Sequence, residues 1–431
     1  MERRLNFGIV VGLISFAIEA LVSTLVFPLL LKYLGKTDAG LWMLFVSLGA
    51  LLQCFMSGLA PAVSRYVATV AGRESVGSIQ GEAWAGVRIS LTRVYGVALL
   101  VGWVIGCLLI PFYLIGVGRQ GGHTAFNISV VWSSYLFGWG ARAVIQRNFS
   151  ALDGLGEVGY NRVVNTLGGI TNFGILLWFL PMGIGVWAPV GSYVVVSLIV
   201  FLISIYLLRE KAPAGWYTKT SVPWLESRLL ATDALKMFVL GATSYVVGQS
   251  CILFVERGAG IATLATFAPV AKVVTLMAGA ASMPNSMMIP YLARAFNAND
   301  SPKFRRFAWM SIFLAPLLYL LPALVLFIYP REIFGWWLGA DNFVGEGVTR
   351  LMLLYGLVFC AHSGLAAPAL AVRHRSFVRE SVINMVLVLV LMPLFATYFG
   401  LCGYPLGMII GTLLPSVMVC TQSIRFLKGR I

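Results

Sequence analysis

The amino-acid sequence predicts an all-α, polytopic integral membrane protein with about twelve transmembrane helices in two six-helix bundles. Three observations predict this fold class: the composition, the spacing of the apolar segments and the distribution of charge. Of the 431 residues, 59% are hydrophobic and only 11% are charged. About a quarter of the residues of a soluble globular chain are charged. The composition therefore excludes an ordinary soluble protein and argues against intrinsic disorder.

The apolar segments recur at the length that a bilayer crossing requires, which is about 20 residues. Hydropathy windows of about 19 residues give twelve spans: 8–31, 39–62, 94–116, 126–146, 163–181, 186–208, 237–255, 262–290, 307–329, 348–371, 381–399 and 403–424. The least apolar span is 126–146, because it contains Asn127, Ser133, Ser134 and Arg142. The first span follows a basic N-terminus but is too long for a signal peptide, so we expect a retained helix.

The basic residues predict the orientation of these spans. With both termini inside, the inner loops and ends hold 23 Lys and Arg, the outer loops and outer span ends hold 6, and 2 lie deep in the spans. Short cytoplasmic loops retain basic residues during membrane insertion, so both termini are expected to be cytoplasmic. The net charge of +15 is then mainly an orientation signal that faces an anionic leaflet, and we expect no nucleic-acid partner.

The longest polar stretch, 209–236, separates the spans into two sets of six. It predicts an N-terminal six-helix bundle at 1–208, a cytoplasmic linker at 209–236 and a C-terminal six-helix bundle at 237–431. The linker contains Trp216, Tyr217 and Trp224 among basic residues, a composition typical of segments that lie on the inner headgroups.

A weak internal repeat supports this division. MGIGVWAPVGSYVV (182–195) and FGLCGYPLGMIIGT (399–412) share glycines and a proline in similar places between the last two spans of each set. Corresponding spans run in the same direction, which predicts parallel repeats related by an axis along the membrane normal.

The common catalytic and cofactor motifs give little support for an enzyme. GLGEVG (154–159) has the GxGxxG spacing, but a dinucleotide site requires a preceding strand, whereas this segment lies between two predicted membrane helices. The three histidines are scattered and the six cysteines lack metal-site spacing, so we expect no disulfide, metal or cofactor. GIVVG (8–12) and GWVIG (102–106) have the GxxxG spacing of closely packed membrane helices.

The ionisable residues inside the spans are the candidate functional groups: Glu19, Arg142 and Lys272. Each such group costs about 2.5–3.5 kcal/mol on the insertion scale and tends to face a cavity or a partner. Glu19 shares a helical stripe with Ser15 and Ser23. For this glutamate a cavity role and a structural ion pair, with Lys272 for example, both remain open.

Arg142 and Lys272 have similar alternatives. Arg142 shares a helix face with Tyr135 and Gln146, but its position near the inner end of its span would also allow its charge to snorkel toward the headgroups. Lys272 follows Pro269, which can kink a helix and free a carbonyl beside the cation.

The segment 27–68 reads FPLLLKYLGKTDAGLWMLFVSLGALLQCFMSGLAPAVSRYVA. It contains, in order, an apolar helix, a Leu-Gly turn, the tripeptide Gly-Leu-Trp, and a second helix that ends in small residues followed by an arginine and an aromatic residue. This order resembles bacterial O-antigen and polysaccharide flippases, whose superfamily also holds multidrug exporters and the lipid II flippase. FGWWLGADNF (334–343) and the glycine turn at 400–403 extend the resemblance over nearly the whole chain. The matching residues are Leu34, Gly35, Gly40, Leu41, Trp42, Gly58, Arg65 and Tyr66.

The resemblance implies two lobes around a cleft that opens alternately to each side of the bacterial cytoplasmic (inner) membrane. Its implied cargo is an anionic, polyprenyl-diphosphate-linked oligosaccharide, moved from the inner to the outer leaflet for O-antigen, capsule or exopolysaccharide synthesis. Besides this cargo, membrane lipids and polysaccharide polymerase machinery are the expected partners. We hypothesise that Arg142 and Lys272 bind the diphosphate or an acidic glycan, because Arg and Lys neutralise phosphate. Glu19 would balance charge or carry a coupling proton.

Two other functions stay open. An ion-coupled multidrug exporter of the same superfamily would favour cavity carboxylates, whereas Arg142 and Lys272 favour an anionic cargo. A membrane-embedded polysaccharide polymerase or ligase would place catalytic residues on a long outer loop, and the longest one, 330–347, offers only four charged residues. We therefore expect a transporter rather than an enzyme. The sequence leaves open the glycan, the coupling ion and the oligomeric state.

Overall fold

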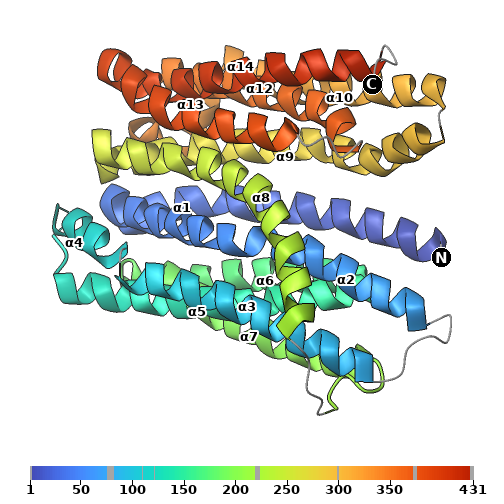
Figure 1. Cartoon of the computed structure of the whole chain (residues 1–431). Coiled ribbons are helices and arrows are strands. Elements are labelled where there is room, and N and C mark those ends of the chain that lie inside the picture. The colour runs from blue at the N-terminus through green and yellow to red at the C-terminus, as the bar shows by residue number, and fades with distance from the viewer. Residues whose placement is uncertain are drawn as a thin grey trace. The chain divides into compact units, whose positions relative to one another are not determined.

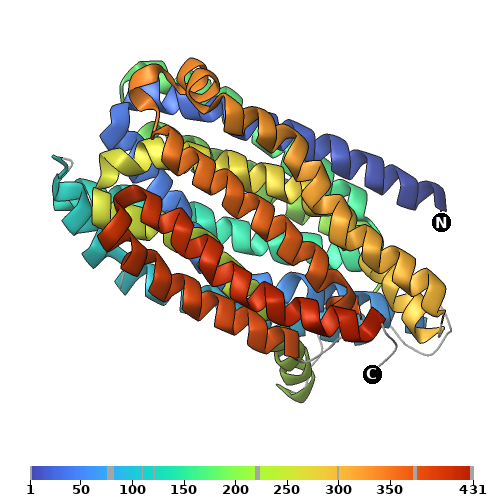
Figure 2. The same ribbon diagram turned by 90° about the horizontal axis from the view of Figure 1, so that it is seen from above.

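The computed structural model describes residues 2–74, 82–108, 110–120, 122–218, 224–298, 300–371 and 376–427, and all regular structure in these ranges is helical. Figures 1 and 2 show the helices from two directions. The first helices are α1 (Glu2–Ser57), α2 (Leu59–Glu74), α3 (Glu82–Leu108), α4 (Ile110–Gln120), α5 (Ala125–Gly154), α6 (Val158–Phe179) and α7 (Trp187–Lys211). They are followed by α8 (Trp224–Ala259), α9 (Ile261–Asn297), α10 (Ser301–Ile328), α11 (Pro330–Leu338), α12 (Glu346–Ala371), α13 (Ser376–Phe399) and α14 (Gly403–Leu427).

The fold is that of an all-α polytopic membrane protein. Within the described ranges, eight helical regions are long and apolar enough to cross a membrane, and the two longest, Ile14–Ala71 and Val378–Thr421, have 58 and 44 residues, more than one crossing needs. Gly35, at φ 72° and ψ 177°, interrupts α1 between two predicted spans. Helices α5 and α8 have 30 and 36 residues, which is long enough to cross at 1.5 Å per residue.

Contacts within the chain define two compact units, Met1–Tyr245 (unit 1) and Val246–Ile431 (unit 2). The division falls inside α8, so the first part of this helix belongs to unit 1. The predicted bundle limits, 1–208 and 237–431, remain a prediction. The segment predicted as a linker between them, 209–236, is helical at both ends, where α7 ends and α8 begins.

Trp216 attaches the segment predicted as a linker to unit 1, and the expected position at the headgroups stays a prediction. Its side chain is only 2% exposed and packs on Trp84 of α3, with the ring centroids 6.0 Å apart. Tyr217 is 53% exposed beside it, whereas the side chain of Trp224 lies outside the described residues. The segment is therefore anchored on unit 1 through a buried indole, because burying so large an apolar ring stabilises more than leaving it at the headgroups.

The two sequence segments that suggested a repeat have similar local structures. A 3-10 turn, η1 (Leu180–Met182), precedes α7, and another, η3 (Gly400–Cys402), precedes α14. Gly183 and Gly400 have φ values of 69° and 55°, a region that glycine enters without steric cost. The helix contacts of the two units also correspond. Helices α5 and α6 pack on α7 in unit 1, and helices α12 and α13 pack on α14 in unit 2.

Glycines let α5 pack closely in unit 1, as the 102–106 motif predicts. A Cβ built on Gly102 would lie 2.4 Å from the ring of Trp139 on α5. The carbonyl of Gly106 accepts a hydrogen bond of 2.8 Å from the Trp132 indole. Gly12 of the 8–12 motif has no described atom within 4 Å of an added Cβ, and Gly8 lies among residues whose surroundings are not described, so that motif stays a prediction.

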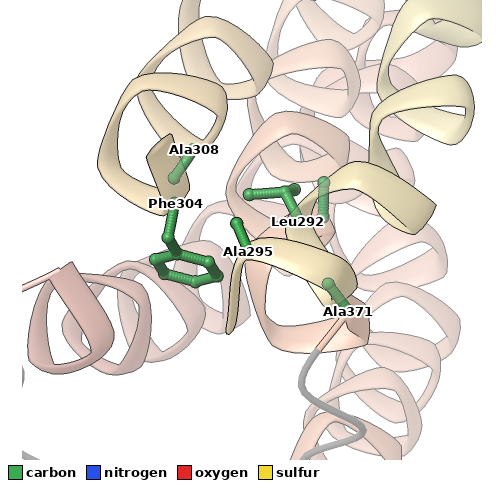
Figure 3. Close-up of a cluster of buried hydrophobic side chains, with 6 residues drawn as sticks. Leu292, Ala295, Phe304, Ala308 and Ala371 are labelled. Carbon is green, nitrogen blue, oxygen red and sulfur yellow. The ribbon is translucent and has the colours of Figure 1, made fainter. Parts of the chain in front are cut away.

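Small residues also shape the core of unit 2. A cluster of buried side chains joins α9, α10 and α12, and Figure 3 shows the Phe304 ring of α10 pointing toward Ala295 of α9. The members are Leu292, Ala295, Phe304, Ala308, Ala367 and Ala371. Alanine lets helix axes approach closely, so in a bilayer such contacts supply dispersion attraction between helices.

Candidate functional site

Unit 1 contains a polar cavity of about 420 Å³ among α1, α2, α5, α6 and α7. Such a volume is typical of sites that bind small molecules or parts of larger ones. Helix α5 contributes more of the lining than any other helix. The strongly polar lining residues are Gln53, Arg142, Gln146, Asp153, Asn161 and Asn165.

Arg142 is the cation on the wall of this cavity. Its Nε donates a hydrogen bond of 3.2 Å to the Ser197 hydroxyl of α7, and its guanidinium carbon lies 5.9 Å from the centroid of the Tyr193 ring. Ser197 is fully buried, whereas Arg142 is half-buried. The serine and the ring therefore orient the guanidinium, and its two terminal amino groups donate no hydrogen bond to the described residues. Because Arg142 has a hydrogen-bond acceptor and an aromatic ring as partners at this position, it need not extend toward the headgroups to reach a polar environment.

Stacked aromatic rings form the wall beside Arg142. Tyr135 of α5 stacks on Tyr193 of α7 with centroids 4.8 Å apart, and on Trp132 with centroids 5.3 Å apart. Trp42 meets Tyr135 edge-on at 5.9 Å. Gly49 makes this possible, because a Cβ there would lie 2.2 Å from the Tyr135 hydroxyl. Offset and edge-on pairs of this kind add stabilisation beyond their buried area, so this wall is rigid.

Hydrogen-bonded polar groups line the cavity beyond Arg142. The Gln53 amide donates to the Gln146 side-chain oxygen and joins α1 to α5. The Ser150 hydroxyl donates to the Gln146 carbonyl, and the Ser64 hydroxyl of α2 donates to the Ser150 carbonyl. Each amide has further donors and acceptors that these bonds do not use. The lining can therefore bind hydroxyl groups or water.

Asp153 brings a carboxyl group to the same cavity, beyond the predicted span 126–146. One carboxyl oxygen accepts a hydrogen bond of 3.0 Å from Asn161, which is itself bonded to Asn165. The other oxygen is buried without a partner among the described residues. Burial raises the pKa of Asp153 to about 6, although the Asn161 hydrogen bond and the Arg162 charge oppose the increase. This carboxyl therefore titrates close to physiological pH.

The structure places the three predicted site residues in different surroundings. Arg142 lines the cavity together with Tyr135 and Gln146, its neighbours on the predicted face. Glu19 is exposed on α1 and Lys272 is exposed on α9, and neither lines the cavity. Because Lys272 belongs to unit 2 and Glu19 to unit 1, a shared cargo or an ion pair between them remains a prediction.

The described histidines have ordinary side-chain partners. His123 Nε2 lies 2.7 Å from the Asp38 carboxylate, and His362 Nδ1 lies 2.9 Å from the Ser416 hydroxyl. His374 lies outside the described residues. Within the described ranges, no three His, Cys, Asp or Glu side chains gather in a group that could hold a metal ion. The six cysteines, all within the described ranges, form no disulfide with one another.

The GLGEVG segment forms a turn between helices. Gly154 ends α5, Gly156 has a φ of 90°, and α6 begins at Val158. A Cβ on Gly154 would lie 2.7 Å from the Ser64 carbonyl of α2. The first glycine therefore serves helix packing and the second serves the turn, and a helix precedes the motif where a dinucleotide site requires a strand.

Neither a protein-family model nor a curated protein matches this sequence. Solved structures do match its fold. An inward-facing multidrug resistance MATE family transporter of the MOP superfamily matches with a TM-score of 0.77 and 14% identity over 97% of this chain and 98% of the other. The lipid II flippase MurJ, in an inward closed conformation, matches with a TM-score of 0.67 and 12% identity over 97% and 92%. A MOP superfamily transporter from Pyrococcus furiosus, whose description reports a binding pocket of reversed polarity, matches with a TM-score of 0.62 and 14% identity over 98% and 95%.

These likenesses establish the fold class of the chain. Each matched structure is a transporter or flippase by its description, and each is covered almost completely by this chain. The identities are low, so the likenesses do not assign a cargo.

Sequence reasoning missed several residues of the cavity. Asp153 falls between the predicted spans 126–146 and 163–181, and no pattern in the sequence distinguishes Gln53, Asn161 and Asn165. A usable signal was present, because Arg142, Gln146 and Asp153 have spacings of 4 and 7 residues, the periodicity of one helix face. The partners on α1 and α6 had no such signal, because they come from helices that are distant in sequence.

Proposed function

We propose that this chain is an alternating-access flippase that moves a polyprenyl-diphosphate-linked oligosaccharide from the inner to the outer leaflet of the bacterial cytoplasmic membrane. The observation that carries the proposal is the oriented Arg142 guanidinium on the wall of the polar cavity in unit 1. The fold likeness to transporters, including a lipid II flippase, supports the same class of function.

The chemistry of the cavity suits part of such a cargo. A diphosphate cannot cross hydrocarbon bare, and a guanidinium offers paired donors for phosphate oxygens. The terminal amino groups of Arg142 are available for this role. The amides of Gln53 and Asn165 line the same space and can donate to and accept from sugar hydroxyls. The lipid tail would stay in the bilayer while the head group enters the cavity.

Lys272 and Glu19 have separate roles in the proposal. Lys272 is the second cation that contacts the diphosphate or an acidic sugar at one stage of the cycle. Glu19 balances charge or carries a coupling proton. Both are exposed within predicted spans, and a charge in such a position requires water or a partner because hydrocarbon contact is costly.

Asp153 favours a second candidate, an ion-coupled exporter of cationic compounds. A carboxyl with a pKa of about 6 in the cavity can exchange a proton for a cation near neutral pH. Multidrug transporters also stand among the matched folds. The two candidates predict opposite roles for Arg142 and Asp153, so one pair of variants separates them.

The decisive experiment is a flipping assay in proteoliposomes with a lipid-linked oligosaccharide. A hydrogen bond to a charged group contributes about 1.5–3 kcal/mol, so Arg142→Gln should slow flipping about tenfold or more. Lys272→Gln is expected to act in the same direction. Arg209→Gln is the matched control, because Arg209 is exposed in the last turn of α7 and does not line the cavity.

The same proteoliposomes test the alternative. If Asp153→Asn abolishes uptake of a cationic dye while Arg142→Gln leaves it intact, and neither affects the oligosaccharide, the chain is an exporter. Normal flipping by a well-expressed Arg142→Gln, Lys272→Gln double variant would also reject the flippase proposal. For Glu19, flipping by Glu19→Gln that still responds fully to a proton gradient would exclude the coupling role.

A further inference from the structure

Two arginines lie together in unit 1 outside the polar cavity, at the end that the charge distribution predicts to be cytoplasmic. Arg88 belongs to α3 and Arg147 to α5, and neither lines the cavity. The Arg88 guanidinium carbon lies 5.8 Å from the centroid of the Tyr217 ring. Tyr217 follows the buried Trp216, so the anchored segment positions its ring beside the arginine.

The Arg147 side chain is held in one orientation. Its Nε and one terminal nitrogen donate hydrogen bonds of 3.2 and 3.0 Å to the Asn148 side-chain oxygen. The other terminal nitrogen donates a bond of 3.4 Å to the Thr92 hydroxyl. Asn148 is fully buried and donates in turn to Ser204 of α7 at 3.0 Å. An exposed arginine that only fixes the orientation of the protein in the membrane needs no such hydrogen bonds, because it acts through its charge alone.

The two arginines are joined through Thr92, whose hydroxyl accepts from Arg147 and donates to the Arg88 carbonyl one helical turn away at 2.8 Å. Their positive charges are therefore close, and they lack a compensating acid among the described residues. Burial lowers the pKa of Arg147, and the nearby Arg88 charge lowers it further, while Tyr95 and Tyr217 act in the opposite direction. Neither arginine forms an ion pair with a described carboxylate. The Arg88 Nε is buried and donates no hydrogen bond to the described residues. Two adjacent cations, one with an unused donor, repel each other unless an anion lies between them.

We propose that Arg88 and Arg147 form a binding site for a phosphate group, with the Tyr217 ring at its rim. Arginine is the preferred residue for phosphate because its planar fork presents paired donors. Both guanidiniums are half-buried and Tyr217 is exposed, so a ligand can reach the site. The group is supplied by an anionic phospholipid headgroup of the adjacent leaflet or by a free phosphate.

The test uses the full-length protein in nanodiscs and measures binding instead of transport, so its outcome is independent of the proposed cargo. In one arm, phosphatidylglycerol is added to phosphatidylcholine nanodiscs, and native mass spectrometry counts the phosphatidylglycerol retained. In the second arm, inorganic phosphate is titrated into phosphatidylcholine nanodiscs, with sodium chloride at matched ionic strength as the control. Thermal unfolding is followed in both arms.

For the wild type we expect the unfolding temperature to rise in one of the two arms. The arm in which it rises identifies the source of the phosphate. Arg88→Gln should weaken the binding about tenfold, because one charge-assisted contact is lost. Arg88→Lys should retain part of it, since the charge remains without the fork. Arg209→Gln, which changes an exposed arginine of α7, should bind as the wild type does.

A response of the wild type in neither arm would overturn the proposal, and this outcome requires no variant to fold. Equal weakening by Arg209→Gln and Arg88→Gln would also overturn it, because the binding would then depend on general surface charge.

Discussion

Helices α5 and α12 occupy comparable positions, each packing on the last complete helix of its unit, yet they differ in what their inner faces do. Helix α5 presents Arg142, Gln146 and Asp153 to a polar cavity. Helix α12 instead buries Gly364 and Ala367 in the contact with α9 and α10. The comparison shows that the same arrangement of helices can enclose a cavity or a packed core, depending on the side chains along a single helix face.

The physical reason is the balance between helix approach and hydration. A Cβ on Gly364 would lie 2.5 Å from the Ser311 carbonyl of α10, so the backbones touch where side chains are smallest. Along α5, the side chains at 142, 146 and 153 carry polar groups that lose hydrogen bonds if the space closes dry. They therefore keep a hydrated cavity where an alanine-rich face would close it.

The largest expected effect comes from adding the same side chain to each region. Gly364→Val in unit 2 forces backbone apart and should destabilise the protein by up to about 3 kcal/mol. Ala50→Val adds methyl groups to a position that lines the cavity of unit 1 and should cost less than about 1 kcal/mol, mainly through helix propensity. Thermal unfolding of the purified variants measures both.

Gly174→Ala is the control for these substitutions, because Gly174 lies in α6 with nothing within 4 Å of an added Cβ. It should be neutral or slightly stabilising. Equal destabilisation by the two valine variants would show that the cavity of unit 1 closes as tightly as the core of unit 2.

An intermediate effect is expected from pH at Asp153. Its pKa is raised from 3.8 to about 6 in the folded protein, so the contribution of this group to stability is greatest below pH 4 and is lost as the pH rises through 6. Asp153→Asn, which keeps an acceptor for Asn161, should therefore match the wild type near pH 4 and be more stable above pH 6. The difference stays below about 3 kcal/mol, because solvent screens a partly exposed carboxyl.

Unfolding midpoints measured across this pH range give the result. A stability difference that is already complete at pH 4, or that has the opposite sign at pH 7, would contradict the assigned shift in the pKa of Asp153.

The smallest expected effect concerns the orientation of Arg142. Ser197→Ala removes the acceptor for the Arg142 Nε, and a net contribution of about 0.5–1.5 kcal/mol corresponds to a slowing of flipping of several-fold. Arg142 keeps its charge, so the loss should be smaller than in Arg142→Gln. Ser192→Ala is the control, because the Ser192 hydroxyl bonds only within its own helix.

Combining Ser197→Ala with Arg142→Gln completes a double-mutant cycle. If the two losses add, the serine does not act through the arginine.

Much of the fold could be predicted from the sequence. The described residues of the predicted spans are almost all helical, and the interruption at Gly35 and the turns at Gly183 and Gly400 lie between predicted spans. Hydropathy works because every backbone polar group in a bilayer must be bonded within its own helix, which leaves few alternatives for an apolar run of that length. The candidate site was predicted less completely, because Arg142 was singled out while Asp153 was assigned to a loop.

The sequence by itself determined the class of fold and the cation on the face of α5. Only the tertiary structure decided which other groups share its cavity, that Trp216 is buried on α3, and that Arg88 lies near Arg147. The physical reason is the separation along the chain of the residues that interact. Hydrophobic periodicity is local along the chain, whereas a cavity or a cluster of charges is formed by helices far apart in sequence, whose approach depends on side-chain size at their contacts.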